Sequence, residues 1–502
     1  MSYKKKVLSN VVYNFLAFLA ISVSGYVFWI ILGNYLLPGE YGVVSFIIAL
    51  FSFLFPISTL GGKSPPAKFI SEFVSKKETS KIKPLVWFSV KVTIFLSLLL
   101  GILTTVFLLF FGSYFGIVVG FESLIYLIVP MLLFGSLMQI GYGVLMGFQE
   151  FKSIFYSNAI AAVIKIIMTF GLAYLLFGGF GGIISFIVWS IVSFVSMFFY
   201  MRKKLPKISE NFDKSKFISY GKSAMFSGLM IFLITQGPLI FLPLISTMES
   251  VGFFRVAVLF GMIIQFPAFF INPALMPSIS NFWSSGKKER ATTFFNITMK
   301  YLFITLLPIV MLVAVFSRFI VSLIYRPEYL LSVPFIFPYL LGSFFFSIIL
   351  LIINFFFYTD EPKRLVQLSS LSAITNIILI FILVPMFDAI GASYAFLVSQ
   401  IIVTLISCYL IGKKIKFDVK NLIKITLIVI PFSILIYIIK LVFNNIVYTS
   451  ISVVISVLLL FLLFLKLRIF DVNDIKFLET IPDLPILLNI KQFLISVIKN
   501  NM

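Results

Sequence analysis

The stretch LVWFSVKVTIFLSLLLGILTTVFLLFF, residues 85–111, contains one charged side chain, Lys91. A helix needs roughly 20 apolar residues to cross the hydrocarbon core of a bilayer, which is about 30 Å thick. In lipid the backbone hydrogen bonds must be satisfied inside the segment, and a helix does this by itself. Residues 85–111 therefore predict a membrane-spanning helix.

Stretches of the same kind recur along the chain, separated by short polar loops. The composition agrees with this pattern, because 61% of the residues are hydrophobic, 11% are charged and 63 of the 502 are Phe. We expect an all-α polytopic membrane protein with about 14 transmembrane helices. The predicted spans are 9–32, 41–60, 85–111, 123–146, 153–177, 180–200, 223–246, 250–281, 293–325, 333–358, 365–386, 389–412, 425–443 and 449–467.

The net charge of +21 could indicate binding to nucleic acid, but the basic residues are concentrated in alternate loops. If Lys4, Lys5 and Lys6 lie in the cytoplasm and the spans alternate, 32 of the 39 Lys and Arg fall in cytoplasmic segments. Short cytoplasmic loops are enriched in Lys and Arg. We therefore predict a multi-pass protein of the cytoplasmic (plasma) membrane with both termini inside. The basic charge then attracts anionic lipid head groups, and no nucleic-acid partner is expected.

The chain also repeats itself with an offset of about 210 residues. The matching positions are Pro38–Val43 with Met248–Phe253, Gly181-Gly182 with Gly391-Ala392, and Glu150 with Asp360. Two halves of six spans in the same orientation are typical of parallel-repeat transporters, which place a cavity between two bundles. We predict a first bundle at 1–205, a second at 206–424, two further spans within 425–467 and a cytoplasmic tail at 468–502. In the tail, apolar residues between 486 and 498 follow a helical period, which favours an interfacial helix.

Four cations lie within predicted spans, and we expect two of them, Lys91 and Lys300, to extend along their alkyl stems to the membrane interface. The other two are candidates for the site. With a helix rise of ~1.5 Å per residue, Lys165 lies roughly 18 Å into the fifth span and Arg255 roughly 8 Å into the eighth. We expect both to face the cavity and bind phosphate, since Lys offers a compact charge and Arg a planar fork. The alternatives are that Arg255 extends to the membrane interface and that Lys165 pairs with a backbone carbonyl or with Asn158.

The acidic residues show the opposite distribution. All 18 Asp and Glu lie in loops, in tails or at the ends of predicted spans, and the chain has no His. Proton relays and sodium sites in exporters usually need buried carboxylates or His. This counts against an exporter built on an intramembrane carboxylate, although sodium held by carbonyls and hydroxyls stays open. We find no nucleotide-binding Gly-rich loop, and we expect no enzymatic activity, cofactor or metal site.

Uncharged polar residues and prolines complete the set of candidates within the spans. Polar side chains could bind sugar hydroxyls, or each could form an interhelical hydrogen bond; they are Asn14, Gln139, Gln236, Gln265, Asn272, Asn376 and Gln400. Prolines bend helices because they remove a backbone donor. Five of them lie in spans 7 and 8, as hinges or as static kinks: Pro238, Pro243, Pro267, Pro273 and Pro277.

Four loop segments resemble those of a known family. They are Leu32–Gly42 between spans 1 and 2, Gly147–Phe151 before span 5, Pro277–Ser280 followed by Gly286–Lys288, and Ile390–Ala395 at the entry to span 12. With these, the chain resembles the polysaccharide-export, or Wzx-like, flippases of the MATE/MurJ (MOP) superfamily over spans 1 to 12. Many of these relatives carry a charge in span 7, whereas this chain has Thr235-Gln236-Gly237-Pro238 there.

The resemblance implies a flippase for cell-surface polysaccharide or glycan biosynthesis. Its substrate would be an oligosaccharide on a polyprenyl diphosphate, and its partners the bilayer and a glycan polymerase or glycosyltransferases. The alternatives are a cation-coupled exporter of amphipathic small molecules and a flippase for a peptidoglycan precursor. A membrane enzyme that uses lipid-linked sugars would need a large outside loop with carboxylates, and the longest such loop, 112–122, has only Glu122. The sugar, the lipid carrier and the energy source leave no sequence signal.

Overall fold

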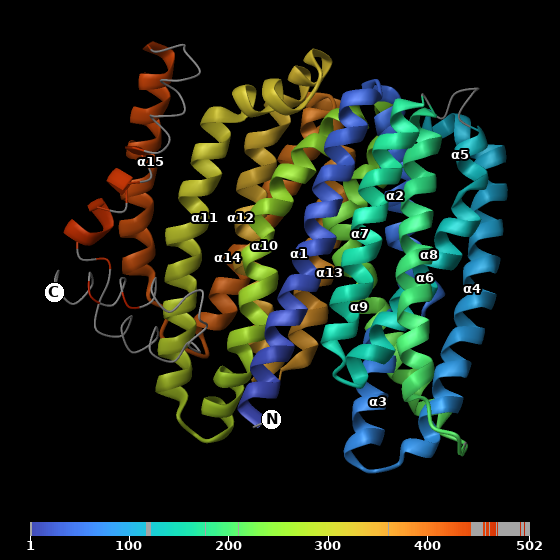
Figure 1. Ribbon diagram of the computed structural model, residues 1–502. Coiled ribbons are helices and arrows are strands. Elements are labelled where there is room, and N and C mark those ends of the chain that lie inside the picture. Colours follow the sequence, from blue (N-terminus) through green and yellow to red (C-terminus); the bar gives the residue numbers. More distant parts are fainter. Residues whose placement is uncertain are drawn as a thin grey trace. The chain divides into compact units, whose positions relative to one another are not determined.

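The computed structural model describes residues 3–116, 122–175, 177–208, 210–359 and 361–442, and parts of 455–469. The regular elements in these residues are helices (Figure 1). They are α1 (Tyr3–Tyr35), α2 (Pro38–Ser58), α3 (Ser64–Ser75), η1 (Thr79–Lys81), α4 (Ile82–Phe111), η2 (Gly112–Phe115), α5 (Glu122–Tyr126), α6 (Ile128–Gly147), α7 (Phe151–Tyr174), α8 (Gly178–Lys204), α9 (Lys214–Phe241), η3 (Leu242–Leu244), α10 (Met248–Ser284), α11 (Lys288–Ile324), η4 (Pro327–Ser332), α12 (Val333–Tyr358), α13 (Pro362–Phe387), α14 (Ile390–Gly412) and α15 (Val419–Val442).

The helices agree with the predicted spans. In the described residues, 13 helical segments are long and apolar enough to cross a membrane, and they overlap the first 13 predicted spans. The predicted fourteenth span, 449–467, and the amphipathic segment 486–498 fall largely outside the described residues. The prediction of an all-α polytopic membrane protein is confirmed.

The sequence marks several helix ends. Pro38 occupies the first turn of α2, where its missing N–H costs nothing and its fixed φ favours the helix. Asp213 caps α9, because its carboxylate accepts a hydrogen bond of 3.1 Å from the backbone N–H of Lys216. The last turn of α8 carries three cations that oppose the negative end of the helix dipole: Arg202, Lys203 and Lys204.

A short helix, α3, lies in the loop between the second and third predicted spans. Pro65 and Pro66 begin it, and Phe69, Ile70 and Phe73 are buried. It packs on α4, α6 and α9, at the end of the bundle opposite to α5 (Figure 1). With 12 residues it is too short to cross a membrane, so sequence analysis assigned the segment to a loop.

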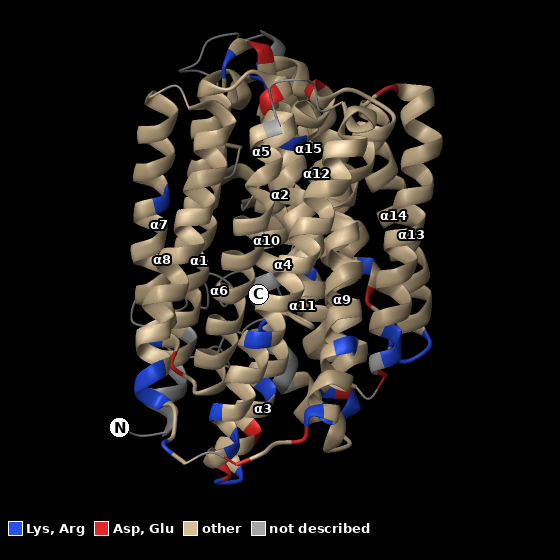
Figure 2. Ribbon diagram, turned by 90° about the vertical axis from the view of Figure 1, so that its right-hand side faces the viewer, with Lys and Arg blue, Asp and Glu red and all other residues tan. Residues whose placement is uncertain are grey.

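The chain forms two compact units that are not contiguous in sequence. The first unit comprises Met1–Val256, Ser322–Ser332 and Ser372–Ala395, and the second comprises Ala257–Val321, Val333–Leu371 and Phe396–Met502. In the first unit α1 packs on α7, α6 and α7 pack on α8, α4 packs on α6, and α2 packs on α9. Lys and Arg gather at the end of this unit that carries α3 (Figure 2). The two bundles at 1–205 and 206–424 stay a prediction.

The first unit contains a reciprocal contact between the start of α2 and the start of α10. A Cβ added at Gly42 would overlap the carbonyl oxygen of Met248, and one added at Gly252 would overlap that of Pro38. Gly42 and Gly252 are 210 residues apart, and so are Pro38 and Met248. Helices related by a local two-fold axis make contacts of this kind, and only glycine leaves room for them. The predicted repeat offset therefore reappears as a symmetric backbone contact.

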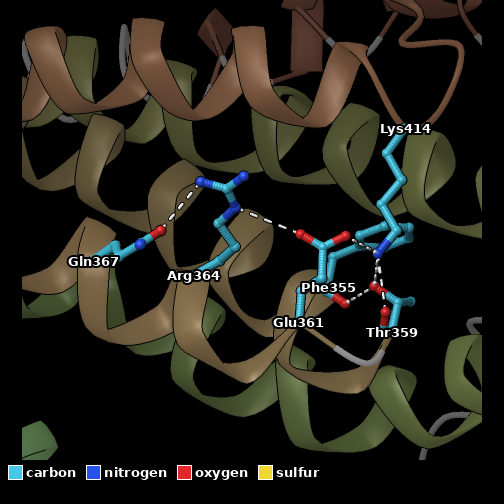
Figure 3. Close-up of polar contacts among 6 residues, drawn as sticks. All are labelled: Phe355, Thr359, Glu361, Arg364, Gln367 and Lys414. Carbon is cyan, nitrogen blue, oxygen red and sulfur yellow. Dashed lines mark hydrogen bonds and ion pairs between the residues drawn. The ribbon is translucent and has the colours of Figure 1, made fainter.

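In the second unit, a polar cluster joins the ends of α12, α13 and α14 (Figure 3). The Lys414 ammonium donates hydrogen bonds to the carbonyl and hydroxyl oxygens of Thr359 and to the Glu361 carboxylate, each at 2.9 Å. Arg364 binds the other carboxylate oxygen at 3.5 Å and donates to Gln367 at 3.1 Å. The hydrogen bond from Lys414 and the charges of both cations hold the pKa of the Glu361 carboxyl below its usual value.

Candidate functional site

Lys165 lies inside the first unit, within a box of aromatic rings. Its ammonium is 4.4 Å from the ring centroid of Phe28 on α1, and 5.4 Å and 4.9 Å from those of Phe186 and Trp189 on α8. Only 4% of the residue is exposed. Burying a lone ammonium is costly, and the negative faces of aromatic rings offset part of that cost. The structure thus holds this cation in the membrane without a carboxylate among the described residues.

Further polar groups are buried on α7 and α8. Asn158 lies seven residues before Lys165, which places both on one face of α7. Asn158 accepts a hydrogen bond of 3.2 Å from the Ser193 hydroxyl, so its described partner is on α8 rather than Lys165. The Asn158 amide nitrogen, the Ser157 hydroxyl and the Trp189 indole nitrogen are buried without a partner among the described residues. All three groups can donate hydrogen bonds, which suits an anion.

Arg255 lies on α10 and contacts two other helices of the first unit. Its guanidinium stacks 3.9 Å above the Trp29 ring of α1 and donates a hydrogen bond of 3.3 Å to the Gln236 side chain of α9. The residue is 5% exposed, so protein encloses it. The structure therefore brings together two of the predicted site residues, Arg255 and Gln236.

An aromatic seal lies beside the glycine contact; it comprises Trp29, Tyr41, Tyr325 and Tyr329. The rings of Trp29 and Tyr41 are 5.3 Å apart, and Tyr329 lies 5.4 Å from both Tyr41 and Tyr325. All four residues are buried. The Tyr329 hydroxyl also donates a hydrogen bond of 3.1 Å to the Leu36 carbonyl. Arg255, stacked on Trp29, is thus separated from this end of the unit by packed rings.

Lys63, which was not among the predicted site residues, is one of the exposed cations at the other end of the first unit. Its ammonium lies 4.6 Å from the ring centroid of Tyr142 on α6. The Tyr142 hydroxyl donates a long hydrogen bond of 3.4 Å to the side chain of Asn14 on α1, a predicted site residue. Lys63 is exposed, yet surrounding protein desolvates the ammonium and lowers its pKa. We call these three residues the Lys63 cluster.

The backbone of Lys63 is fixed by close contacts on two sides. Gly61 approaches Gly221 and Ala224 of α9 so closely that a Cβ would clash, and Gly143 of α6 approaches the Lys63 backbone in the same way. Leu60, Gly61 and Gly62 all have positive φ, at 49°, 99° and 70°. Such a turn favours glycine. The sequence signal was Gly61-Gly62-Lys63 before two prolines, between two spans.

The remaining candidates are spread over both units. In the first unit Gln139 is half-buried on α6, Pro238 is buried in α9, and Pro243 lies in η3. In the second unit Gln265 donates a hydrogen bond of 3.2 Å to Ser343 and Pro267 is half-buried in α10.

α10 continues through Pro273, but the side chains of 269–278, Asn272 among them, are outside the described part. Asn376 donates a hydrogen bond of 3.4 Å to the Ile234 carbonyl, which fits an interhelical role.

The buried charged side chains that the structure describes all have one sign. Among the described side chains, the buried charged residues are Lys165, Arg255 and Lys300, and none is Asp or Glu. Lys300 donates a hydrogen bond of 3.3 Å to the Ile469 carbonyl in the second unit. No group of three or more metal-binding side chains occurs among the described residues. The described interior therefore favours anions over cations as ligands.

Comparisons with known proteins agree with the fold. An uncharacterized membrane protein of Methanocaldococcus jannaschii, MJ1068, is 21% identical over 84% of this chain and 87% of its own length. The structure of the lipid II flippase MurJ in an inward closed conformation has a TM-score of 0.72 and 18% identity, covering 91% of this chain and 98% of that one. An inward-facing MATE family transporter of the MOP superfamily has a TM-score of 0.65 and 14% identity, covering 78% and 94%.

The family described as "polysaccharide biosynthesis protein" matches residues 31–334, more than half of the chain. This match includes both glycines of the reciprocal contact, and also Lys165, Arg255 and Lys63. The chain therefore belongs to that polysaccharide biosynthesis family, as the loop segments indicated, and has the fold of the MurJ and MATE proteins of the MOP superfamily.

Proposed function

We propose that this protein is a flippase that moves a lipid-linked oligosaccharide, carried on a polyprenyl diphosphate, across the cytoplasmic membrane. The observation that carries the proposal is the sign of the buried charge: Lys165, Arg255 and Lys300 are buried, whereas no described Asp or Glu is. A diphosphate needs cations in its path. Family membership adds the link to polysaccharide biosynthesis.

The chemistry of the head group explains why a protein is required. Sugar hydroxyls and phosphates lose their hydrogen bonds to water when they enter hydrocarbon, which costs several kcal/mol for each group. A polar path through the protein replaces that water. The head group first meets the Lys63 cluster, where the ammonium attracts phosphate and the exposed Asn14 offers an amide to a hydroxyl. Gln139, Gln236 and Gln265 are further contacts for the sugar.

Lys165 and Arg255 act on the phosphates deeper in the membrane. In this conformation three aromatic rings surround the Lys165 ammonium, and the Trp29 ring stacks on the Arg255 guanidinium. Arg255 becomes available when α10 moves away from α1, and Lys165 becomes available when α1 and α8 move apart. The Arg255 guanidinium can then bind two phosphate oxygens at once.

The movement is alternating access between the bundles at 1–205 and 206–424, with both termini in the cytoplasm and without covalent chemistry. Pro238, Pro243, Pro267 and Pro273 are the hinge positions, because each proline weakens the helix backbone locally. The driving force is an ion gradient, the membrane potential or consumption of the product outside. A glycan polymerase or a glycosyltransferase is the partner that consumes or supplies the lipid-linked glycan.

Two other functions remain to be separated from this one. A cation-coupled exporter of amphipathic small molecules would use a carboxylate in the membrane, and no described carboxylate is buried. A peptidoglycan-precursor flippase would use the same diphosphate chemistry. Head-group competition separates these functions: excess lipid II should compete only if this protein accepts it.

The test is a flipping assay in liposomes that contain the purified protein and a fluorescent polyprenyl diphosphate sugar. We expect the probe to change leaflets without nucleotide. Lys165→Ala and Arg255→Ala should each slow it about tenfold or more, since each removes a charge-assisted contact. The matched control is Lys91→Ala, which removes an exposed lysine of α4 and should leave the rate unchanged. Sugar transfer in place of translocation, or full activity of both variants, would contradict the proposal.

A further inference from the structure

The second unit contains an apolar groove that the proposed function does not use. The groove has a volume of about 300 Å³ and is lined by residues of α11, α12, α14, α15 and the connection before α15. Its polar lining residues are Thr404, Cys408 and Thr426, and the others are apolar. Three apolar lining residues of α15 are about half exposed or more: Val419 (47%), Ile423 (52%) and Leu427 (67%). These helices are candidate membrane spans, so the groove opens toward hydrocarbon rather than water.

The connection from α14 to α15 and the first turns of α15 place positive charge at one end of this groove. Residues 413–424 contain five lysines and one acidic residue, Asp418. Lys414 is bound to Glu361 and Thr359. The other four lysines are exposed, and none forms an ion pair with a described residue; they are Lys413, Lys416, Lys420 and Lys424. Asp418 accepts a hydrogen bond of 2.7 Å from Asn421.

The charged connection is held rigidly beside the groove. The Asn296 side chain on α11 donates a hydrogen bond of 2.9 Å to the Lys416 carbonyl and accepts one of 3.3 Å from the Asp418 backbone N–H. Between them, Phe417 lines the groove and packs 6.2 Å from the Phe295 ring. A lysine-rich surface therefore adjoins the apolar lining within one residue of the chain.

We propose that this groove binds an anionic phospholipid of the bilayer, with one acyl chain between α14 and α15 and the phosphate at Lys416, Lys420 and Lys424. The apolar lining fits an acyl chain and excludes a sugar. The unneutralised lysines select an anionic head group over a zwitterionic one, because basic sites at the cytoplasmic ends of spans attract anionic lipids. This lipid is a bound component of the membrane, and the inference is independent of the transported substrate.

Cys408 provides a direct test, because it is the only cysteine of the chain and lines the groove. The unmodified protein in detergent is treated with N-ethylmaleimide in the presence of phosphatidylglycerol or of phosphatidylcholine with the same acyl chains. We expect phosphatidylglycerol to slow alkylation about tenfold more than phosphatidylcholine does, from three lysine contacts in part screened by water. Equal protection by the two lipids would overturn the proposal.

A triple variant, Lys416→Gln with Lys420→Gln and Lys424→Gln, should remove the difference between the two lipids. The matched control removes the same charge elsewhere in the second unit, with Lys287→Gln, Lys288→Gln and Arg290→Gln, and should retain it. If the control also loses the difference between the two lipids, the effect depends only on the net charge of the protein. That result would overturn the assignment of the phosphate to Lys416, Lys420 and Lys424.

A second measurement covers the case in which the thiol fails to react. Phosphatidylglycerol should raise the unfolding temperature of the parent protein and of the control, but not that of the triple variant; no rise in the parent would overturn the proposal. Protection by polyprenyl phosphate at a concentration where phosphatidylglycerol gives none would assign the groove to the carrier lipid instead.

Discussion

The two ends of α2 have contrasting environments. At Pro38 the helix meets α10 backbone to backbone, through Gly42 and Gly252, beside buried aromatic rings. Beyond Ser58 the chain turns through three residues with positive φ and reaches Lys63, an exposed residue. One end of the same helix is therefore dry and sealed, while the other is charged and accessible.

This difference means that the two ends of α2 have different freedom to change conformation. A backbone contact without side chains has little freedom to adjust, so the glycine end is either closed or open. The Lys63 end is held by α6 and α9 through Gly143 and Gly61, and its side chain remains available to a ligand. In the proposed function a head group reaches Lys63 in this conformation, while the aromatic seal separates Arg255 from the opposite end.

The largest expected effect concerns which end faces the cytoplasm. η2 lies next to η3, and its neighbour Gly116 approaches Met248, so Ser113 marks the sealed end. In a Cys408→Ser background, Ser113→Cys should react with a membrane-impermeant maleimide in intact cells and Ser285→Cys should not, as the charge distribution predicts. Labelling of Ser285→Cys and not of Ser113→Cys would reverse the assignment of the two ends.

The sealed end should open when a methyl group is added to its contact. Gly42→Ala or Gly252→Ala forces a Cβ against a carbonyl oxygen, which a side-chain rotation cannot relieve, and should destabilise the closed state by about 1–3 kcal/mol. Ser45, about one helical turn after Gly42, is 1% exposed. In the Cys408→Ser background, Ser45→Cys should resist the maleimide in the parent and react in the alanine variants.

The matched control for that experiment is Gly39→Ala. A Cβ at this position would lie 3.7 Å from the Glu249 side chain, an ordinary contact. It should leave Ser45→Cys protected. If Gly39→Ala and Gly42→Ala expose the thiol equally, helix propensity rather than the reciprocal contact controls the closure.

At the accessible end, transport should depend both on the charge of Lys63 and on the position of its backbone. Lys63→Gln should weaken transport of the polyprenyl diphosphate probe three- to tenfold, measured as a rise in the half-saturating concentration, because water screens part of the charge. Gly143→Ala keeps the charge but displaces the Lys63 backbone, so it should weaken transport in the same direction. The control is Gly171→Ala, since nothing lies within 4 Å of its added Cβ. If Gly143→Ala transports the probe with an unchanged half-saturating concentration, the exact position of the Lys63 backbone is not needed for transport.

The smallest effect tests the polar cluster of the second unit, formed by Glu361, Lys414, Thr359 and Arg364. The folded-state pKa of Glu361 is lowered, so its ion pairs stabilise the protein fully above the unfolded pKa of about 4.3 and begin to lose that effect below it, until pH has fallen through the lower folded-state pKa. The Glu361 side chain is 42% exposed, which limits the gain to about 1 kcal/mol.

Unfolding temperatures should therefore fall more between pH 7 and pH 4 for the parent than for Glu361→Gln. Glu72→Gln is the control, because the exposed pair with Lys76 should contribute nothing measurable. Identical pH profiles of the parent and Glu361→Gln would show that the hydrogen bonds to Thr359 hold Lys414 without a contribution from Glu361.

Sequence patterns predicted the spans well because hydrophobic length is a property of consecutive residues. The same patterns selected Lys165 and Arg255 as buried cations, since charge in a span is visible without coordinates. They did not reveal that Phe28, Phe186 and Trp189 enclose Lys165, because those rings come from two other helices.

Lys63 was missed for a different reason. It belongs to a loop whose lysines had already been explained by membrane topology, and its desolvation depends on distant segments. The repeat offset, by contrast, was readable, but the contact between Gly42 and Gly252 was not, since a sequence repeat does not state where its copies meet.

The reciprocal glycine contact also constrains how such a chain can arise and change. If the two halves descend from one duplicated segment, Gly42 and Gly252 were once the same codon, facing its own copy across the axis. Each now limits the other through backbone atoms, so no side-chain replacement nearby can compensate for a larger residue at either place. The two copies are free to diverge along most of their length, yet at this point they inherit a shared restriction.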